Sequence, residues 1–158
     1  MTNKNKNKKG FTLIELLVVV AIIGALAAVG VVAYNGYIGA ARENSTKSIH
    51  NSVAKYIANE RGKCALDENA TIMGGTITCS TDGSSEASVI VTLLTGGTVL
   101  QDKDPYDGGL AVVSETPTKA RGNVVLTPDD TAETILLTTC WDKDCAEDAL
   151  TTTVSVGE

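Results

Sequence analysis

The chain has 158 residues, of which 43% are hydrophobic and 20% charged, and its formal net charge is −6. This length allows one compact domain plus one extended element, but not two independent hydrophobic cores. Residues 1–10 hold four lysines and no acidic residue, so the rest of the chain has a net charge of −10. Such an acidic chain repels phosphate backbones and has no basic stripe interleaved with aromatic residues, so we expect no direct nucleic-acid partner.

The N-terminal region combines a basic segment with a long apolar one. Residues 1–10 have no apolar side chain after Met1 and are predicted to be a leader peptide. Residues 16–34 are uncharged and almost wholly apolar, and as a helix they would span about 28 Å, close to the thickness of a bilayer core. The lysines place the leader in the cytoplasm. A conventional secretory signal is cut after its apolar stretch, whereas here the small Gly10 precedes it. An uncleaved single-span anchor is the alternative.

Helical periodicity continues beyond the apolar segment. Ile49, Val53, Tyr56 and Ile57 follow one another at helical spacing. The rest of the helical wheel is predicted to be a polar face, and it contains Lys47, His50, Asn51, Lys55 and Glu60. Gly62 is a plausible helix stop. The sequence therefore predicts one helix of about fifty residues, from near residue 11 to near residue 61, which turns amphipathic where it leaves the apolar zone.

The composition after Gly62 shifts to Thr, Ser, Gly and Asp with short β-branched runs, which is typical of strands and turns. Residues 86–95 have the apolar content of a helix or of a buried strand, and we expect a helix. Strands are predicted at residues 110–113, 123–127 and 134–141, with an edge strand or a frayed tail at 151–156. The expected fold class is α+β, with the C-terminal half of the long helix packed on a small antiparallel sheet.

The segment GFTLIELLVVVAIIG at residues 10–24 resembles the class III signal of type IV pilins and type II secretion pseudopilins. The resemblance covers residues 8–42, because AYNGYI at 33–38 and the residues up to Arg42 are also similar; Val32 stands where many members have proline. It implies that a membrane peptidase, the prepilin peptidase, cuts after Gly10 and methylates the new N-terminal amine of Phe11. Glu15 would then be the fifth residue of the mature chain.

Glu15 needs an explanation because a carboxylate inside a hydrocarbon span costs about 2.5–3.5 kcal/mol. In a filament, the N-terminal amine of Phe11 in a neighbouring subunit is an available cation, and methylation preserves its charge. Such a pair would set the axial register between subunits. Glu15 at the headgroup boundary, reaching the water at little cost, is the alternative from sequence chemistry. The resemblance favours the assembly role.

The resemblance also implies a domain organisation and a function. Residues 1–10 would be the leader, and residues 11–41 would be the transmembrane and assembly half of the helix. Residues 42–158 would form a globular head, made of an amphipathic helix at 42–61 and a disulfide-braced sheet region at 62–158.

The chain would be the structural subunit of a type IV pilus. Its partners would be further copies of itself, the prepilin peptidase, an inner-membrane assembly platform and a separate cytoplasmic ATPase. The head would lie in the periplasm before assembly and outside the cell afterwards. A type II secretion pseudopilin and a membrane-tethered binding module are the alternatives.

The four cysteines fall into two sequence-adjacent pairs, Cys64 with Cys79 and Cys140 with Cys145. Outside the inner membrane the compartment is oxidising, so two disulfides are expected. Three connectivities are possible, and the sequential one is the simplest. The CxxC spacing typical of zinc sites and of thioredoxin-like redox sites is absent.

One loop has the composition of a cation site. Asp102, Asp104 and Asp107 lie within a segment, residues 102–109, that is similar to the calcium loop of major pseudopilins, with Tyr106 in place of tryptophan. Calcium is therefore a candidate cofactor, and a solvated turn is the alternative.

We expect no enzyme, because His50 is the single histidine and the sequence has neither a nucleophile elbow nor a glycine-rich phosphate loop.

Overall fold

The computed structural model describes residues 10–79, 87–114, 121–142, 145 and 149–157. Most of the predicted leader, residues 1–9, lies outside them. The chain divides into two compact units, Met1–Gly39 and Ala40–Glu158. We refer to the second unit as the head.

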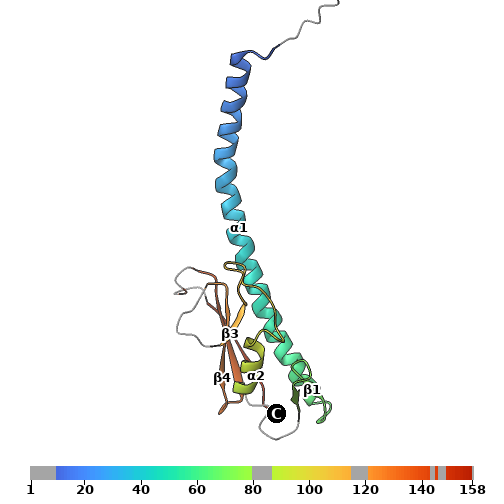
Figure 1. Ribbon diagram of the computed structural model, residues 1–158. Helices are drawn as coiled ribbons and strands as arrows, with labels where there is room; N and C mark the ends of the chain where they lie inside the picture. The colour runs from blue at the N-terminus through green and yellow to red at the C-terminus, as the bar shows by residue number, and fades with distance from the viewer. Residues whose placement is uncertain (1–9, 80–86, 115–120, 143–144, 146–148, 158) are drawn as a thin grey trace, which may run out of the picture. The chain divides into compact units, whose positions relative to one another are not determined.

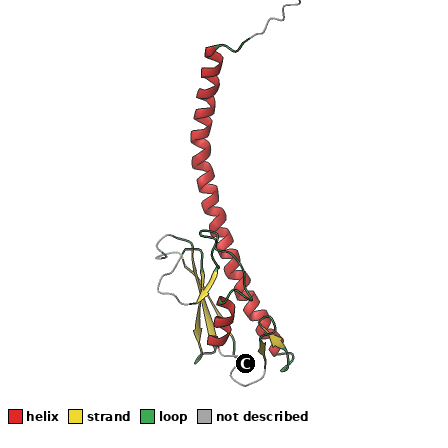
Figure 2. Ribbon diagram, in the orientation of Figure 1, coloured by secondary structure: helices red, strands yellow, loops and turns green. Residues whose placement is uncertain are grey.

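The first element is the continuous helix α1, Leu13–Cys64, which is drawn without a break in Figures 1 and 2. The long helix was predicted correctly, but the stop at Gly62 was wrong, since α1 continues to Cys64. The helix carries Arg61 and Lys63 in its last turn, where cations interact favourably with the helix dipole.

The head contains a short helix and two sheets. Helix α2 spans Ala87–Thr95, as expected, and Gly97 after it adopts a positive φ of 70°. A two-stranded antiparallel sheet pairs β1, Thr71–Ile72, with β2, Ile77–Thr78; this hairpin was not predicted. The larger sheet has the order β3-β4-β5-β6. Its strands are β3, Val112–Ser114; β4, Val124–Asp129; β5, Thr134–Cys140; and β6, Ala149–Ser155.

The α+β fold class is confirmed, but the larger sheet is mixed and not antiparallel throughout. β4, β5 and β6 pair antiparallel in sequence, but β3 pairs parallel with β4. Short apolar runs indicate that a strand forms and carry no information about its direction. The predicted edge strand near the C-terminus is present as β6.

The core of the head lies between one face of this sheet and the two helices. Val53 and Ile57 of α1 and Ile90 of α2 are buried in one cluster with Leu126 of β4 and Leu137 of β5. Alternate residues of β4 and β5 face this core, the pattern of a sheet covered on one side. Figure 1 shows α2 next to β4 of this sheet.

Candidate functional site

The predicted cleavage site lies just before the first turn of α1. Gly10 and Phe11 are exposed, and the Phe11 side chain is 89% accessible. A Cβ added at Gly10 would meet nothing within 4 Å, so packing within the described chain does not require a glycine at this position. Residues 10 and 11 are therefore exposed in the described part of the chain, and cleavage between them stays a prediction.

Glu15 takes part in the N-terminal cap of α1. The backbone N–H of Thr12 donates to Oε2 of Glu15 at 2.8 Å, and the Thr12 hydroxyl donates to the same oxygen at 2.7 Å. In return, the backbone N–H of Glu15 donates to the Thr12 hydroxyl at 3.3 Å. This reciprocal arrangement is a capping box, which satisfies two otherwise unpaired helix donors. Glu15 thus caps the helix locally, and its role in assembly stays a prediction.

The helix that follows exposes its apolar side chains. Among the described residues, α1 is long and apolar enough to cross a membrane, with a mean hydropathy of 3.0 in its most apolar window and none of that window buried. Large exposed side chains occur from Phe11 to Tyr37. Water is a poor solvent for such a surface, so it requires a membrane or other apolar helices around it.

His50 occupies a different place from the one predicted. Instead of lying on a polar face it is fully buried, with Nδ1 2.9 Å from the hydroxyl of Thr139 and Nε2 2.8 Å from the hydroxyl of Thr152. The two threonines belong to β5 and β6, so this ring joins α1 to both strands. Burial lowers the pKa of His50 below its usual 6.5, because desolvation disfavours the imidazolium.

We expect the stability of the head to fall on mild acidification because of His50. The unfolded chain takes up a proton near the ordinary pKa of 6.5, whereas the folded chain does so only at lower pH. The unfolded state therefore binds more protons in this interval, and the free energy of unfolding decreases as the pH falls below about 6.5. Urea unfolding of the full chain at a series of pH values between about 7.5 and 5 measures this.

The matched variant is His50→Gln, whose amide has both a donor and an acceptor but does not titrate here. Its free energy of unfolding should change less than that of the wild type over the same pH interval. Equal pH dependence in the two proteins would contradict this assignment. His50→Ala should cost about 1–3 kcal/mol at neutral pH, because it leaves the buried hydroxyl of Thr139 unpaired.

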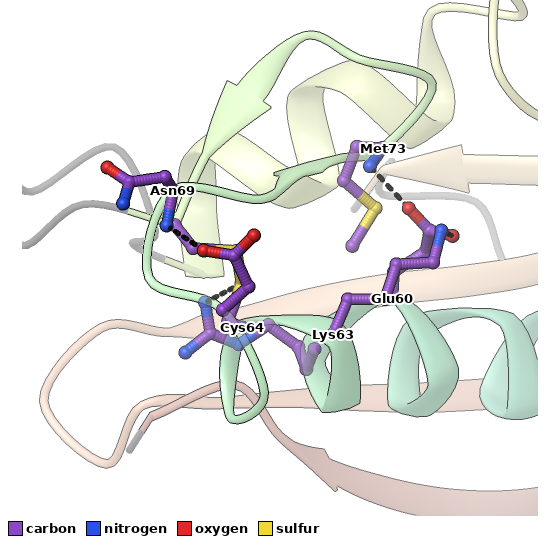
Figure 3. The surroundings of a disulfide bond; sticks show 8 residues. Glu60, Lys63, Cys64, Asn69 and Met73 are labelled. Carbon is purple, nitrogen blue, oxygen red and sulfur yellow. Dashed lines mark hydrogen bonds and ion pairs between the residues drawn. A yellow bond between two sulfur atoms is a disulfide. The ribbon is translucent and has the colours of Figure 1, made fainter.

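Glu60 is a second residue of the predicted polar face that proves to be buried. Its Oε2 accepts a hydrogen bond from the backbone N–H of Met73 at 2.7 Å, and its Oε1 pairs with Lys63. Met73 lies in the turn of the β1–β2 hairpin and has a positive φ of 52°, which non-glycine residues rarely adopt. Figure 3 shows Glu60 reaching from α1 to this turn. The carboxylate thus attaches the hairpin to the helix.

The structure contains disulfides Cys64–Cys79 and Cys140–Cys145, the sequential connectivity. The first joins the last residue of α1 to the residue after β2 and so closes the hairpin loop beside Glu60 (Figure 3). The second closes a short loop after β5. No described cysteine is left as a thiol.

The three predicted calcium ligands do not converge in the structure. Asp104 is buried, with Oδ1 accepting from the N–H of Tyr106 at 2.7 Å, whereas Asp107 is exposed and accepts from the N–H of Gly109. Desolvation raises the pKa of Asp104, and its Oδ2 has no hydrogen-bond partner among the described residues. In the described part of the chain, no three His, Cys, Asp or Glu residues are grouped to hold a metal ion. Calcium binding stays a prediction.

A group of aromatic and basic side chains comes together that the sequence did not predict. We call it the Tyr106 cluster, and it consists of Arg42, Lys47, Tyr106, Arg121 and Trp141. Cζ of Arg42 and Cζ of Arg121 lie 5.7 Å and 4.2 Å from the centroid of the Tyr106 ring. Nζ of Lys47 lies 4.1 Å from the Trp141 centroid. The Arg121 Nε–H donates to the carbonyl of Trp141 at 2.7 Å. No sequence motif indicates this cluster, because its members are brought together only by the fold.

Comparisons with known proteins match part of the chain. The prokaryotic N-terminal methylation motif matches residues 5–31. A fimbrial protein of Moraxella nonliquefaciens is 40% identical over 70 residues, which are 43% of this chain and 46% of that protein. The type IV major fimbrial protein FimA of Dichelobacter nodosus strain VCS1703A is 45% identical over 62 residues, 38% of each chain.

The similarity is therefore partial. The alignments span less than half the length of these first relatives, and another FimA of Dichelobacter nodosus, 33% identical over 88 residues, is matched over 56% of its length. No solved structure gives a significant match. The chain thus carries the methylation motif at its N-terminal end and is similar, over part of its length, to type IV fimbrial proteins.

Proposed function

We propose that this chain is the structural subunit of a type IV pilus filament, cut after Gly10 and polymerised through its N-terminal helix. The observation that carries the proposal is the methylation motif, residues 5–31, which continues into an exposed apolar helix with Glu15 in its first turn. A filament made of such helices buries the apolar surface that the single chain exposes. The names of the relatives, fimbrial protein and type IV major fimbrial protein, support a pilus rather than a secretion pseudopilin.

The proposal includes a sequence of locations and partners. Before assembly, α1 anchors the chain in the inner membrane with the head in the periplasm. Prepilin peptidase removes the leader and methylates the amine of Phe11. An assembly platform with its cytoplasmic ATPase then moves the helix out of the bilayer into a bundle of like helices, and the head becomes extracellular. No catalytic role is proposed for the subunit itself.

The test is the N-terminal mass of the chain after co-expression with its cognate prepilin peptidase. We expect sheared filaments whose subunit begins at methylated Phe11. Gly10→Val should leave the precursor uncut, since it adds a β-branched side chain at the scissile bond. Gly24→Val is the matched control, because a Cβ at either glycine meets nothing within 4 Å. It should be cut normally. An uncut wild-type chain and no filament would leave a membrane-tethered head and contradict the proposal.

A further inference from the structure

The Tyr106 cluster holds two guanidinium groups that form no ion pair with a carboxylate in the described part of the chain. Arg42 and Arg121 are both exposed and lie beside the same ring. Ion pairs between described residues join Lys47 to Glu43 and Lys63 to Glu60, and neither includes an arginine. Like charges held beside one ring repel each other, so a carboxylate from outside would be attracted to both. The cluster is suited to an anionic partner.

A surface of opposite charge lies at the turn between β4 and β5. Asp129, Asp130 and Glu133 are all exposed there, and residues 129–134 include no basic residue. Side-chain carboxylates hold part of the turn, since Oδ1 of Asp129 accepts from the N–H of Thr131 at 3.0 Å and Oδ1 of Asp130 accepts from the N–H of Ser88 at 2.8 Å. We call these three residues the acidic turn. The turn therefore presents three exposed acidic residues on a defined backbone.

The two surfaces lie at opposite ends of the β4–β5 hairpin. Arg121 precedes β4 and bonds to the carbonyl of Trp141, directly after β5. The acidic turn joins the other ends of the two strands, which pair from Val124↔Thr139 to Asp129↔Thr134. Six strand residues span about 20 Å. The two surfaces therefore cannot meet within one molecule, but they can meet between two.

We propose that the Tyr106 cluster of one copy docks on the acidic turn of a second copy. The two surfaces differ, so the contact is heterologous, and repeating it generates an open polymer unless the rotation closes into a ring. The inference rests on the proposed filament function and adds a contact between heads to the helix bundle. Each chain is strongly acidic, so two copies repel each other overall. Attraction at this one site therefore favours the axial register in which the two surfaces meet.

The test uses two charge-reversed full-length subunits co-expressed with the assembly machinery. Arg42→Glu/Arg121→Glu makes the cluster acidic, and Asp130→Lys/Glu133→Lys makes the turn basic. Each variant alone should yield at least tenfold less sheared filament than the wild type, because like charges then meet at every contact. When both are expressed together, each reversed surface meets its complement on the other variant. Filaments containing both subunits should then form.

Several controls make the result decisive. Lys55→Glu changes an exposed lysine of α1 that is outside both surfaces and should leave the filament yield unchanged. Thermal unfolding checks that each reversed head folds. If one does not fold, Arg42→Gln/Arg121→Gln and Asp130→Asn/Glu133→Gln neutralise the same surfaces, and each should lower the yield.

Absence of wild-type filaments would refute the proposed function and not this contact. Full assembly of either variant alone, or no recovery in the mixture of folded variants, would overturn the contact itself.

Discussion

Replacing Glu15 by alanine should reduce the yield of sheared filaments roughly a hundredfold or more, while the precursor is still cut after Gly10. In the proposed filament, the Glu15 carboxylate pairs with the N-terminal amine of a neighbouring Phe11. Removing one partner of a buried ion pair costs about 3–5 kcal/mol, since the other charge stays buried without compensation. Each 1.4 kcal/mol is a tenfold change in an association constant. The filament yield and the N-terminal mass of membrane-held subunits measure the two outcomes separately.

The capping box provides the control that separates the two roles of Glu15. Glu15→Gln can still form the box with Thr12 but has no charge. Thr12→Ala removes the cap and leaves the carboxylate, at a cost of about 1 kcal/mol to the helix. If the charge pairs with a neighbouring amine, Glu15→Gln should assemble as poorly as Glu15→Ala, and Thr12→Ala should assemble well. The reverse order would show that helix capping, and not the charge, explains the requirement for Glu15.

Removing the disulfide of Cys64 should lower the free energy of unfolding of the head by about 3 kcal/mol. The bridge closes a loop of 15 residues in sequence, and cross-linking such a loop restricts the unfolded chain by about that amount. The loop also carries the buried side chains of Ile72 and Ile77, so its attachment to α1 holds part of the core. Urea unfolding of Cys64→Ser/Cys79→Ser, compared with the wild type in the same detergent, measures the loss.

The second bridge is the matched control for the first. Cys140 and Cys145 are separated by 5 residues, so Cys140→Ser/Cys145→Ser should lose only about 2 kcal/mol. A larger loss at the short loop than at the long one would contradict the loop-entropy account. A change of less than about 0.5 kcal/mol in the first variant would show that Glu60 and the core hold the hairpin without the bridge.

The properties of the head that the sequence did not predict have a common physical origin. Periodicity placed Val53 and Ile57 on the buried stripe of α1 correctly, because apolar burial follows the helical repeat. It placed His50 and Glu60 on the polar face, yet both are buried with hydrogen-bond partners. A polar residue can be buried only where the fold supplies partners, and those of His50 lie 89 and 102 residues away in the sequence.

The N-terminal segment is the part of this protein that the sequence by itself determined. The basic segment predicted to be a leader, the small Gly10 at the predicted cut, Glu15 and the long apolar run are local in the chain, and each is recognised from its own chemistry or from the helical repeat. Only the tertiary structure decided the parallel direction of β3, the burial of His50 and the meeting of Arg42 with Arg121 at Tyr106. These depend on contacts between segments far apart in sequence, whose pairing no local pattern encodes.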